Sequence, residues 1–247
     1  MTDSVVVELI AGEGERRCLA DKSLCLEMAP VEEGTDIAGS LILTSPTTGD
    51  VTTTPSLPYG PGNGEGLRLW PYLIAVPKGA EAESDGRSEY LVGVISEERS
   101  MYSGGGGSGG RLHLLRLNQS PDRLSLGDEV LDVVWDSSLM IRACFSEQDG
   151  KDRLGACHDE YRFKGSLTAA ANDGGEFPSL TYRSVATAFP QTSRRSEDNS
   201  GQKLKKSDLA DWKDTECSYQ RVLRYNPATS RYEMDRPAPD CSDYTTP

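Results

Sequence analysis

Short apolar runs broken at close intervals by glycine and proline most constrain how this chain can fold. The 247 residues include 25 glycines and 14 prolines. Between them lie runs rich in β-branched and aromatic residues, at 5–10, 40–44, 67–76 and 90–96. Runs of this length suit strands, whereas most helices need a longer periodic segment. We therefore expect an all-β protein, an antiparallel sandwich or barrel with long Gly/Pro-rich loops.

The second half of the chain has the most regular strand pattern. Strands are predicted over 111–117, 130–135, 139–145, 161–169 and 179–186. A final hairpin is predicted from 218–225 and 231–234, because Asn-Pro initiates turns and tyrosines lie on both arms. Only 204–214 favours a helix, with Ser207 as its N-cap. The chain should therefore hold one or two short helices.

Three segments are predicted to be loops. Prolines and glycines dominate 46–66, and a polar tip over 78–88 joins two strands of a wide hairpin. The tract Ser103-Gly-Gly-Gly-Gly-Ser-Gly-Gly110 has the composition of a flexible linker, whether a natural loop or an engineered splice.

The glycine tract is also the best candidate for a domain boundary. Residues 1–110 hold 7 basic and 17 acidic residues, whereas residues 111–247 hold 19 basic and 22 acidic residues. Most of the net charge of −13 therefore lies in residues 1–110, which end with this tract. Because strand signals lie on both sides of the tract, we expect one domain over 1–247. The alternative is an acidic sub-domain 1–102, a linker 103–110 and a disulfide-stapled sub-domain 111–247.

The six cysteines fall into three sequential pairs. We predict the disulfides Cys18–Cys25, Cys144–Cys157 and Cys217–Cys241, although six cysteines allow 15 pairings. Free thiols in a reducing compartment are the alternative. A zinc site is disfavoured because no C-x-x-C knuckle is present.

Disulfides imply an oxidising compartment, and hence a periplasmic or secreted protein, with a cytoplasmic location as the alternative. Residues Met1 to Glu8 lack the basic start, apolar stretch and cleavage site of a signal peptide. We expect a mature chain whose leader was replaced by an initiator methionine. No run of 18 apolar residues predicts a membrane-spanning helix.

Catalytic residues are hard to find by pattern. Cys157-His158-Asp159-Glu160 is the densest cluster, but Cys157 has a predicted disulfide partner, and neighbouring side chains on a strand point to opposite faces. His113 should lie on the face opposite Leu112 and Leu114, toward solvent or a partner. A serine triad could use either histidine, but no G-x-S-x-G elbow supports one.

Signals for metals, phosphates and nucleic acids are weak. The acidic loop 146–152 offers Asp149 and Asp152 as calcium ligands, but it does not match an EF-hand loop. No Walker or dinucleotide-binding loop is present, so we expect no cofactor apart from that calcium. Acidic residues interrupt the only basic stretch, so nucleic acid is not an expected partner; its basic members are Arg194, Arg195, Lys203, Lys205, Lys206 and Lys213.

The sequence therefore favours recognition over catalysis. We expect a non-catalytic exported binding protein, with a partner protein that would be basic if this chain is an inhibitor or immunity protein for an enzyme or toxin. The sequence does not identify the binding residues. One alternative is an exported hydrolase, metal-assisted in one version, and another is a structural or assembly component of the cell envelope.

Overall fold

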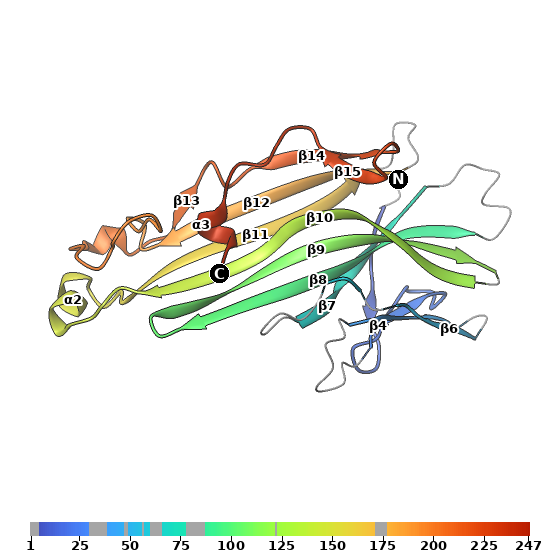
Figure 1. Ribbon diagram of the computed structural model, residues 1–247, viewed down its shortest axis with the longest axis horizontal. Coiled ribbons are helices and arrows are strands. Elements are labelled where there is room, and N and C mark those ends of the chain that lie inside the picture. Colours follow the sequence, from blue (N-terminus) through green and yellow to red (C-terminus); the bar gives the residue numbers. More distant parts are fainter. Residues whose placement is uncertain are drawn as a thin grey trace.

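The computed structural model describes residues 5–29, 39–46, 49–55, 57–59, 66–77, 87–121, 123–170 and 177–247. It confirms the all-β prediction, with 57% of residues in strands and 6% in helices. Two antiparallel sheets carry the fold (Figure 1). No helix in the described ranges is long and apolar enough to cross a membrane.

The larger sheet has ten strands in the order β1-β7-β8-β9-β10-β11-β12-β14-β15, with β13 paired to β12. Their bounds are β1 Val6–Glu8, β7 Gly66–Ala75, β8 Ser88–Tyr102, β9 Gly105–Ser120, β10 Arg123–Arg142, β11 His158–Ala170, β12 Ser179–Phe189, β13 Trp212–Asp214, β14 Gln220–Asn226 and β15 Arg231–Met234.

The smaller sheet has five strands in sequential order. They are β2 Ile10–Ala11, β3 Arg17–Cys18, β4 Cys25–Met28, β5 Leu41–Ser45 and β6 Asp50–Thr53. The described helices are α2 Glu147–Asp152, α3 Ser242–Thr245 and a 3-10 turn, η1 Lys206–Asp208.

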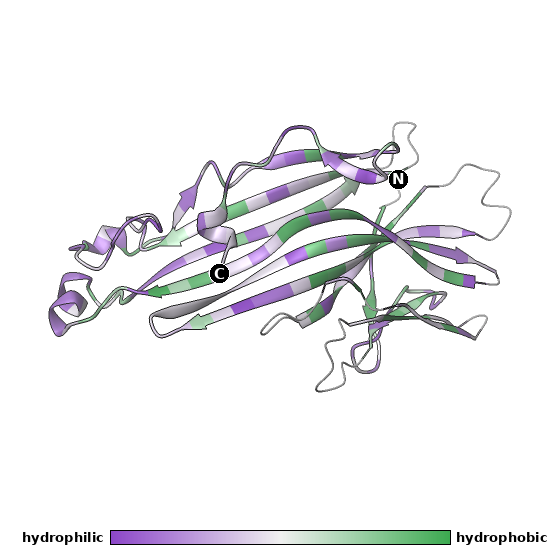
Figure 2. Ribbon diagram, viewed as in Figure 1, coloured by the Kyte–Doolittle hydropathy of each residue, from purple (hydrophilic) through white to green (hydrophobic). Residues whose placement is uncertain are grey.

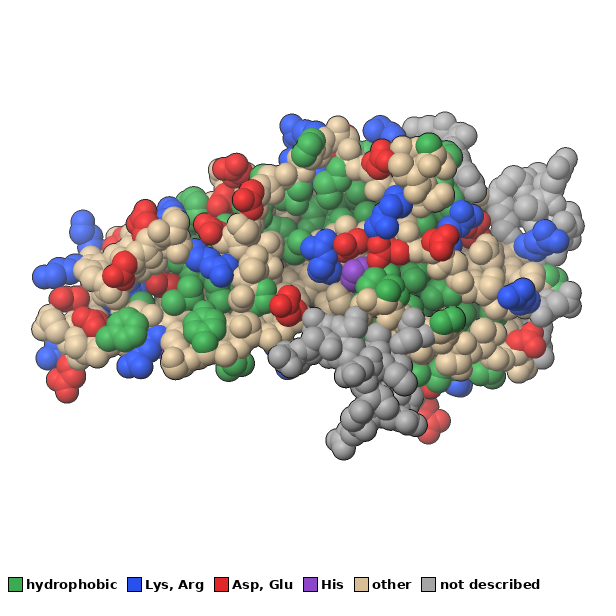
Figure 3. Space-filling view, in the orientation of Figure 1, with side chains coloured by type: hydrophobic (Ala, Val, Ile, Leu, Met, Phe, Trp, Pro, Cys, Tyr) green, Lys and Arg blue, Asp and Glu red, His purple; other side chains and the backbone are tan. Residues whose placement is uncertain are grey.

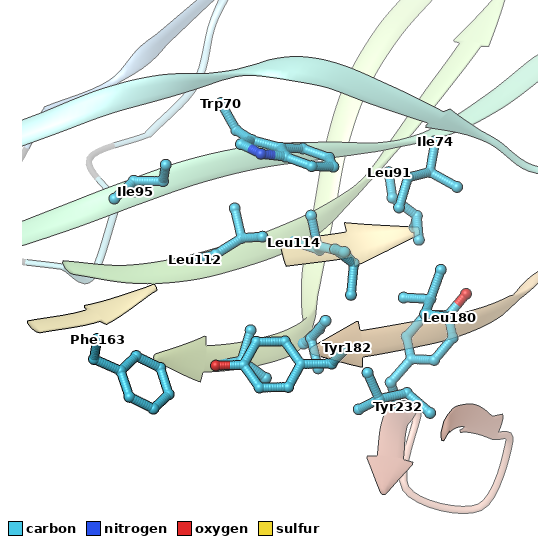
Figure 4. Packing of buried hydrophobic residues seen from close by; sticks show 14 of the residues in the cluster. Trp70, Ile74, Leu91, Ile95, Leu112, Leu114, Phe163, Leu180, Tyr182 and Tyr232 are labelled. Carbon is cyan, nitrogen blue, oxygen red and sulfur yellow. The ribbon is translucent and has the colours of Figure 1, made fainter. Parts of the chain in front are cut away.

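Each face of the β7–β10 region buries a separate apolar core. On one face, Leu73, Val92, Leu115 and Leu117 pack with leucines of the small sheet such as Leu43. On the other face, Trp70 and Leu112 pack with residues from β11–β15, including Tyr182 and Tyr232 (Figure 4). The large sheet therefore curls over one core and carries the small sheet on its outside.

Alternation of side chains explains why the later strands form where they do. Along β11 and β12 nearly every second residue is buried, and Figure 2 shows the same alternation of hydrophobic and hydrophilic residues. Such a period of two suits a sheet with one face in a core. The predicted runs at 161–169 and 179–186 lie within these two strands. The final hairpin also agrees with its prediction, since β14 pairs with β15 around 226–231.

Other predicted runs are combined or divided in the structure. The runs 130–135 and 139–145 belong largely to one strand, β10, which ends at Arg142. The run 5–10 divides at Leu9, because β1 pairs with β7 in the large sheet whereas β2 pairs with β3 in the small one. The predicted loop 46–66 contains β6 within its described part. Most of the hairpin tip 78–88 lies outside the described residues.

The flexible-linker interpretation of 103–110 is wrong for most of the tract. Gly105 to Gly110 form the start of β9 and pair with β8 on one side and β10 on the other. Glycine is needed because the neighbours approach closely: a Cβ on Gly107 would lie 2.9 Å from the Ser138 carbonyl oxygen. Composition alone could not distinguish this close packing from flexibility. Whether the chain is one domain or two remains a prediction.

The predicted helix over 204–214 is also wrong. The structure has only η1 there, followed by β13, which pairs with β12. Ser207 is not an N-cap; instead the Asp208 carboxylate accepts the Lys205 backbone N–H at 2.8 Å. Local capping and strand pairing therefore outweigh the helical propensity of the lysines and leucines.

All three predicted disulfides are present. Their Cα–Cα distances are 4.0 Å for Cys18–Cys25, 4.8 Å for Cys144–Cys157 and 5.7 Å for Cys217–Cys241. The first joins neighbouring strands β3 and β4, and the second closes the loop containing α2. Each bridge therefore staples a local loop, as the spacing predicts.

The close approach at the glycine tract can be tested with a pair of alanine substitutions. A Cβ on Gly105 would overlap the Met140 carbonyl oxygen, whereas one on Gly104 meets only the edge of Tyr102 at 3.9 Å. We expect Gly105→Ala to lower the free energy of unfolding by about 1–3 kcal/mol, a typical cost of overpacking. Gly104→Ala should change it by less than about 0.5 kcal/mol. Urea titration of both variants measures this, and equal stabilities would contradict the packing explanation.

Candidate functional site

The candidate site centres on His113, in the middle of β9. Its neighbours Leu112 and Leu114 are fully buried in the core on the opposite face, as alternation predicts. The expected solvent exposure is wrong, because the His113 side chain is only 7% exposed. The ring of Tyr59 stacks on the imidazole with a centroid distance of 3.7 Å and shields it from water.

Both ring nitrogens of His113 have hydrogen-bond partners. Nδ1 lies 2.8 Å from Glu129 Oε2, and Nε2 lies 3.0 Å from Ser96 Oγ. An ionised carboxylate can only accept, so Nδ1 carries the proton that it shares with Glu129. In the neutral imidazole Nε2 is then an acceptor, and the Ser96 hydroxyl donates to it. The three side chains form a hydroxyl–imidazole–carboxylate relay.

The position of Glu129 depends on an irregularity in β10. The ladder between β9 and β10 shifts register between Leu126 and Glu129 and again between Glu129 and Leu131. Such bulges turn a side chain away from its regular direction. Here the carboxylate reaches His113 and also accepts from Tyr59 OH at 2.6 Å and from Arg231 at 2.5 Å.

These bonds keep Glu129 ionised. Burial alone would raise the pKa of the carboxyl group, but bonds from Tyr59, Arg231 and His113 outweigh it and hold the pKa below its usual value. Burial, and next the bond to Glu129, raise the pKa of the Tyr59 hydroxyl, so it stays protonated and donates. Glu129 thus provides a fixed negative charge behind the imidazole.

A second carboxylate lies near the imidazole but is held by another partner. Asp132 Oδ1 is 3.7 Å from His113 Nδ1, farther than the bonded oxygen of Glu129. Arg111 binds Asp132 through two parallel hydrogen bonds of 2.8 and 2.9 Å. This bidentate pairing fixes Asp132 and leaves Glu129 as the partner of the imidazole.

Ser96 and His113 open onto one cavity of about 420 Å³. Its wall also includes Glu97, Glu98, Arg111 and Thr246, the residue before the last of the chain. Arg111 lies directly across the β8–β9 ladder from Ser96. Figure 3 shows acidic and basic side chains interleaved along the middle of the molecular face drawn there. A hydroxyl next to a base in a cavity of this size is an arrangement suited to nucleophilic chemistry.

The cluster Cys157–Glu160 does not form such an arrangement. Cys157 is in a disulfide, and His158 is exposed at the start of β11. Asp159 is buried and bonded to Arg153 at 2.5 Å and to Ser193 at 2.6 Å. Every member therefore has a structural role or faces solvent.

Both proposed calcium ligands accept local hydrogen bonds. Asp149 Oδ2 accepts the backbone N–H groups of Phe145 and Ser146 in the capping box of α2. Asp152 Oδ1 accepts from Gln148 at 3.0 Å. Across the ranges that the structure describes, no three His, Cys, Asp or Glu residues are grouped so as to hold a metal ion. Calcium binding stays a prediction of the sequence.

The sequence did not indicate Tyr59, Ser96, Arg111 or Glu129 as site residues. Ser96 and His113 become neighbours through the β8–β9 register, in which Ser96 pairs with Arg111 and Val94 with His113. That register is predictable only if the two-residue turn at Ser103-Gly104 is recognised at the start of the glycine tract. No local motif contains these residues, because they lie on separate strands. No family model, curated protein or solved structure matches the chain.

The buried ionised carboxylate gives a test of this network by its effect on stability. We expect Glu129→Gln to lower the free energy of unfolding by about 1–3 kcal/mol at pH 7, as for hydrogen bonds to a charged group. Because the folded-state pKa is lowered, this contribution exists above the ordinary value of 4.5 and disappears as the pH falls through the folded-state value. Urea titrations at pH 7 and pH 3 measure the difference. Glu13→Gln, in an exposed turn, is the control, and a difference that is independent of pH would contradict the ionised network.

Proposed function

We propose that the protein is an exported hydrolase that cleaves acyl esters or amides with Ser96 as its nucleophile. The observation that carries this proposal is the hydrogen-bonded series Ser96 Oγ, His113 and Glu129, with distances of 3.0 and 2.8 Å, beside a cavity. A serine hydroxyl is a weak nucleophile until a neighbouring base accepts its proton. The carboxylate that orients the base is the third member of this arrangement.

The reaction follows from these contacts. As Ser96 Oγ bonds to the acyl carbon, its proton moves to His113 Nε2, and the Glu129 carboxylate stabilises the imidazolium. The bond from the acyl carbon to the leaving group then breaks, and the leaving group takes the proton from His113. Water attacks the acyl-serine ester, giving its proton to His113. Release of the carboxylic acid returns that proton to Ser96.

Arg111 is the group placed to stabilise the oxyanion in this reaction. It faces Ser96 across the ladder and lines the same cavity. Asp132 accepts hydrogen bonds from its Nε and Nη2 and so holds the guanidinium in place, and neither of these two bonds uses Nη1. Preorganised donors of this kind contribute about 10²–10³ in kcat when they meet the developing charge.

The three disulfides support an exported location, because such bonds persist in oxidising compartments. The sequence favoured a binding role because it shows no catalytic constellation despite its many carboxylates. The G-x-S-x-G elbow, whose absence weighed against a triad, is a strand-to-helix turn. Ser96 lies within a long strand, so a serine nucleophile at this position would not carry the G-x-S-x-G motif.

The nucleophile can be tested with a fluorophosphonate probe and with nitrophenyl esters of short acids. We expect the native protein to be labelled at Ser96 and to release nitrophenol. Ser96→Ala and His113→Ala should lower kcat at least about 10³-fold, as removal of triad members does elsewhere. Mass spectrometry locates the label and absorbance follows the ester.

The matched control is Ser100→Ala, four residues along the same strand and partly buried like Ser96. It should keep both labelling and turnover. Circular dichroism and urea titration establish that each variant folds. A folded native protein that neither takes the label nor cleaves any of the esters would overturn the proposal.

Protein recognition is the second candidate function, and one observation favours it. Large apolar side chains are exposed near the β8–β9 turn and the adjoining strand ends: Met101 is 85% exposed and Phe145 65%. Met101 and Met140 line a shallow groove with Gly106 and Gly107. Exposed apolar surface of this kind marks many interaction sites. The partner would be a protein, and a basic one if this chain is an inhibitor or immunity protein.

If the protein recognises a partner, the exposed apolar surface around Met101 should determine the affinity for that partner. Met101→Glu should weaken binding at least about tenfold, because it buries a charge at the contact. Val51→Glu changes an exposed apolar residue on β6 instead and should have no effect. Binding of a purified partner is measured by calorimetry at low and physiological salt. Equal affinities of the two variants would reject this surface, and affinity independent of salt would reject the basic partner.

A further inference from the structure

The charged groups in the wall of the Ser96 cavity do not all have partners. Glu97 is paired with Arg68 at 2.5 Å and lies 3.4 Å from Arg99. Arg111 is paired with Asp132. Glu98 is exposed, and no ion pair of the described residues involves it. The cavity therefore carries one uncompensated carboxylate.

The place of Glu98 relative to Ser96 follows from the strand. The two residues are separated by one position on β8, so their side chains project from the same face of the strand. A rise of about 3.4 Å per residue puts their Cα atoms about 7 Å apart. The Glu98 side chain therefore begins about 7 Å from that of the nucleophile, along the direction of the strand.

The residue opposite Glu98 has no side chain, and the C-terminal segment packs over it. This residue is Gly109, which pairs with Glu98 across the β8–β9 ladder. A Cβ at Gly109 would contact Pro247 Cδ at 3.4 Å and the Thr245 carbonyl oxygen at 3.5 Å. The C-terminal segment thus bounds this end of the cavity, and Glu98 stands beside the glycine.

We propose that Glu98 selects acyl donors that carry a cationic group, an ammonium or guanidinium, about 7 Å from the carbonyl carbon that Ser96 attacks. This inference rests on the proposed hydrolase function and names its substrate class. A substrate with this spacing can place its cationic group at Glu98 while its carbonyl carbon lies at Ser96. The net charge of −13 further raises the local concentration of cationic substrates.

The test compares two esters of nearly equal shape, an Nα-acyl arginine ethyl ester and the corresponding citrulline ester, which is neutral. The readout is the ratio of their kcat/KM values. We expect the native protein to prefer the arginine ester about tenfold, which is within the range that one screened charge pair supports. Added salt should reduce the preference.

Substitutions identify the carboxylate that is responsible. Glu98→Gln should bring the ratio close to one, and Glu98→Lys should reverse it. Glu13→Gln removes the same charge at an exposed turn outside the cavity and should keep the native ratio. A ratio that survives Glu98→Gln would overturn the assignment to Glu98.

Failure of the inference is separable from failure of the proposed function. Equal rates on the two esters, with hydrolysis that Ser96→Ala abolishes, would overturn the charge selectivity and keep the hydrolase. No hydrolysis of either ester, together with no fluorophosphonate label on Ser96, would overturn both.

Discussion

The pairing of β8, β9 and β10 is the constraint on which the rest of this structure depends. These three strands are 15, 16 and 20 residues long and lie side by side over most of their length. Both cores form on their faces, and the cavity lies against them. The glycines at the start of β9 let the three backbones approach along this ladder, so a six-residue segment in which Ser108 alone has a side chain determines the geometry of its neighbours.

Local features of the fold were readable from the sequence, and features that depend on distant segments were not. The cysteine spacing predicted all three disulfides, and Asn226-Pro227 predicted the final hairpin, because each involves residues close in the chain. The prediction of a helix over 204–214 was wrong because β13, within that segment, pairs with β12. The prediction of a flexible linker at the glycine tract was also wrong. Its composition matches a linker, but the tract pairs with β8 and β10 and is therefore a strand.

The candidate site shows the same division. Alternation around Leu112 and Leu114 placed His113 on the correct face, but its burial depends on Tyr59, which is more than 50 residues away in the chain. Glu129 reaches the imidazole only because β10 is bulged on both sides of it. A serine and a histidine on neighbouring strands become partners through register. Nothing in a single sequence reports register until the turn between the strands is recognised.

Two of the hydrogen bonds to the Glu129 carboxylate come from distant parts of the chain. Tyr59 lies in the first quarter of the sequence, and Arg231 lies in the last hairpin. During synthesis, residues 59, 96, 113 and 129 emerge long before residue 231 does. A partly synthesised chain therefore leaves one oxygen of this carboxylate without its guanidinium. The hydrogen-bond network around His113 is complete only after the last hairpin has been synthesised and folded.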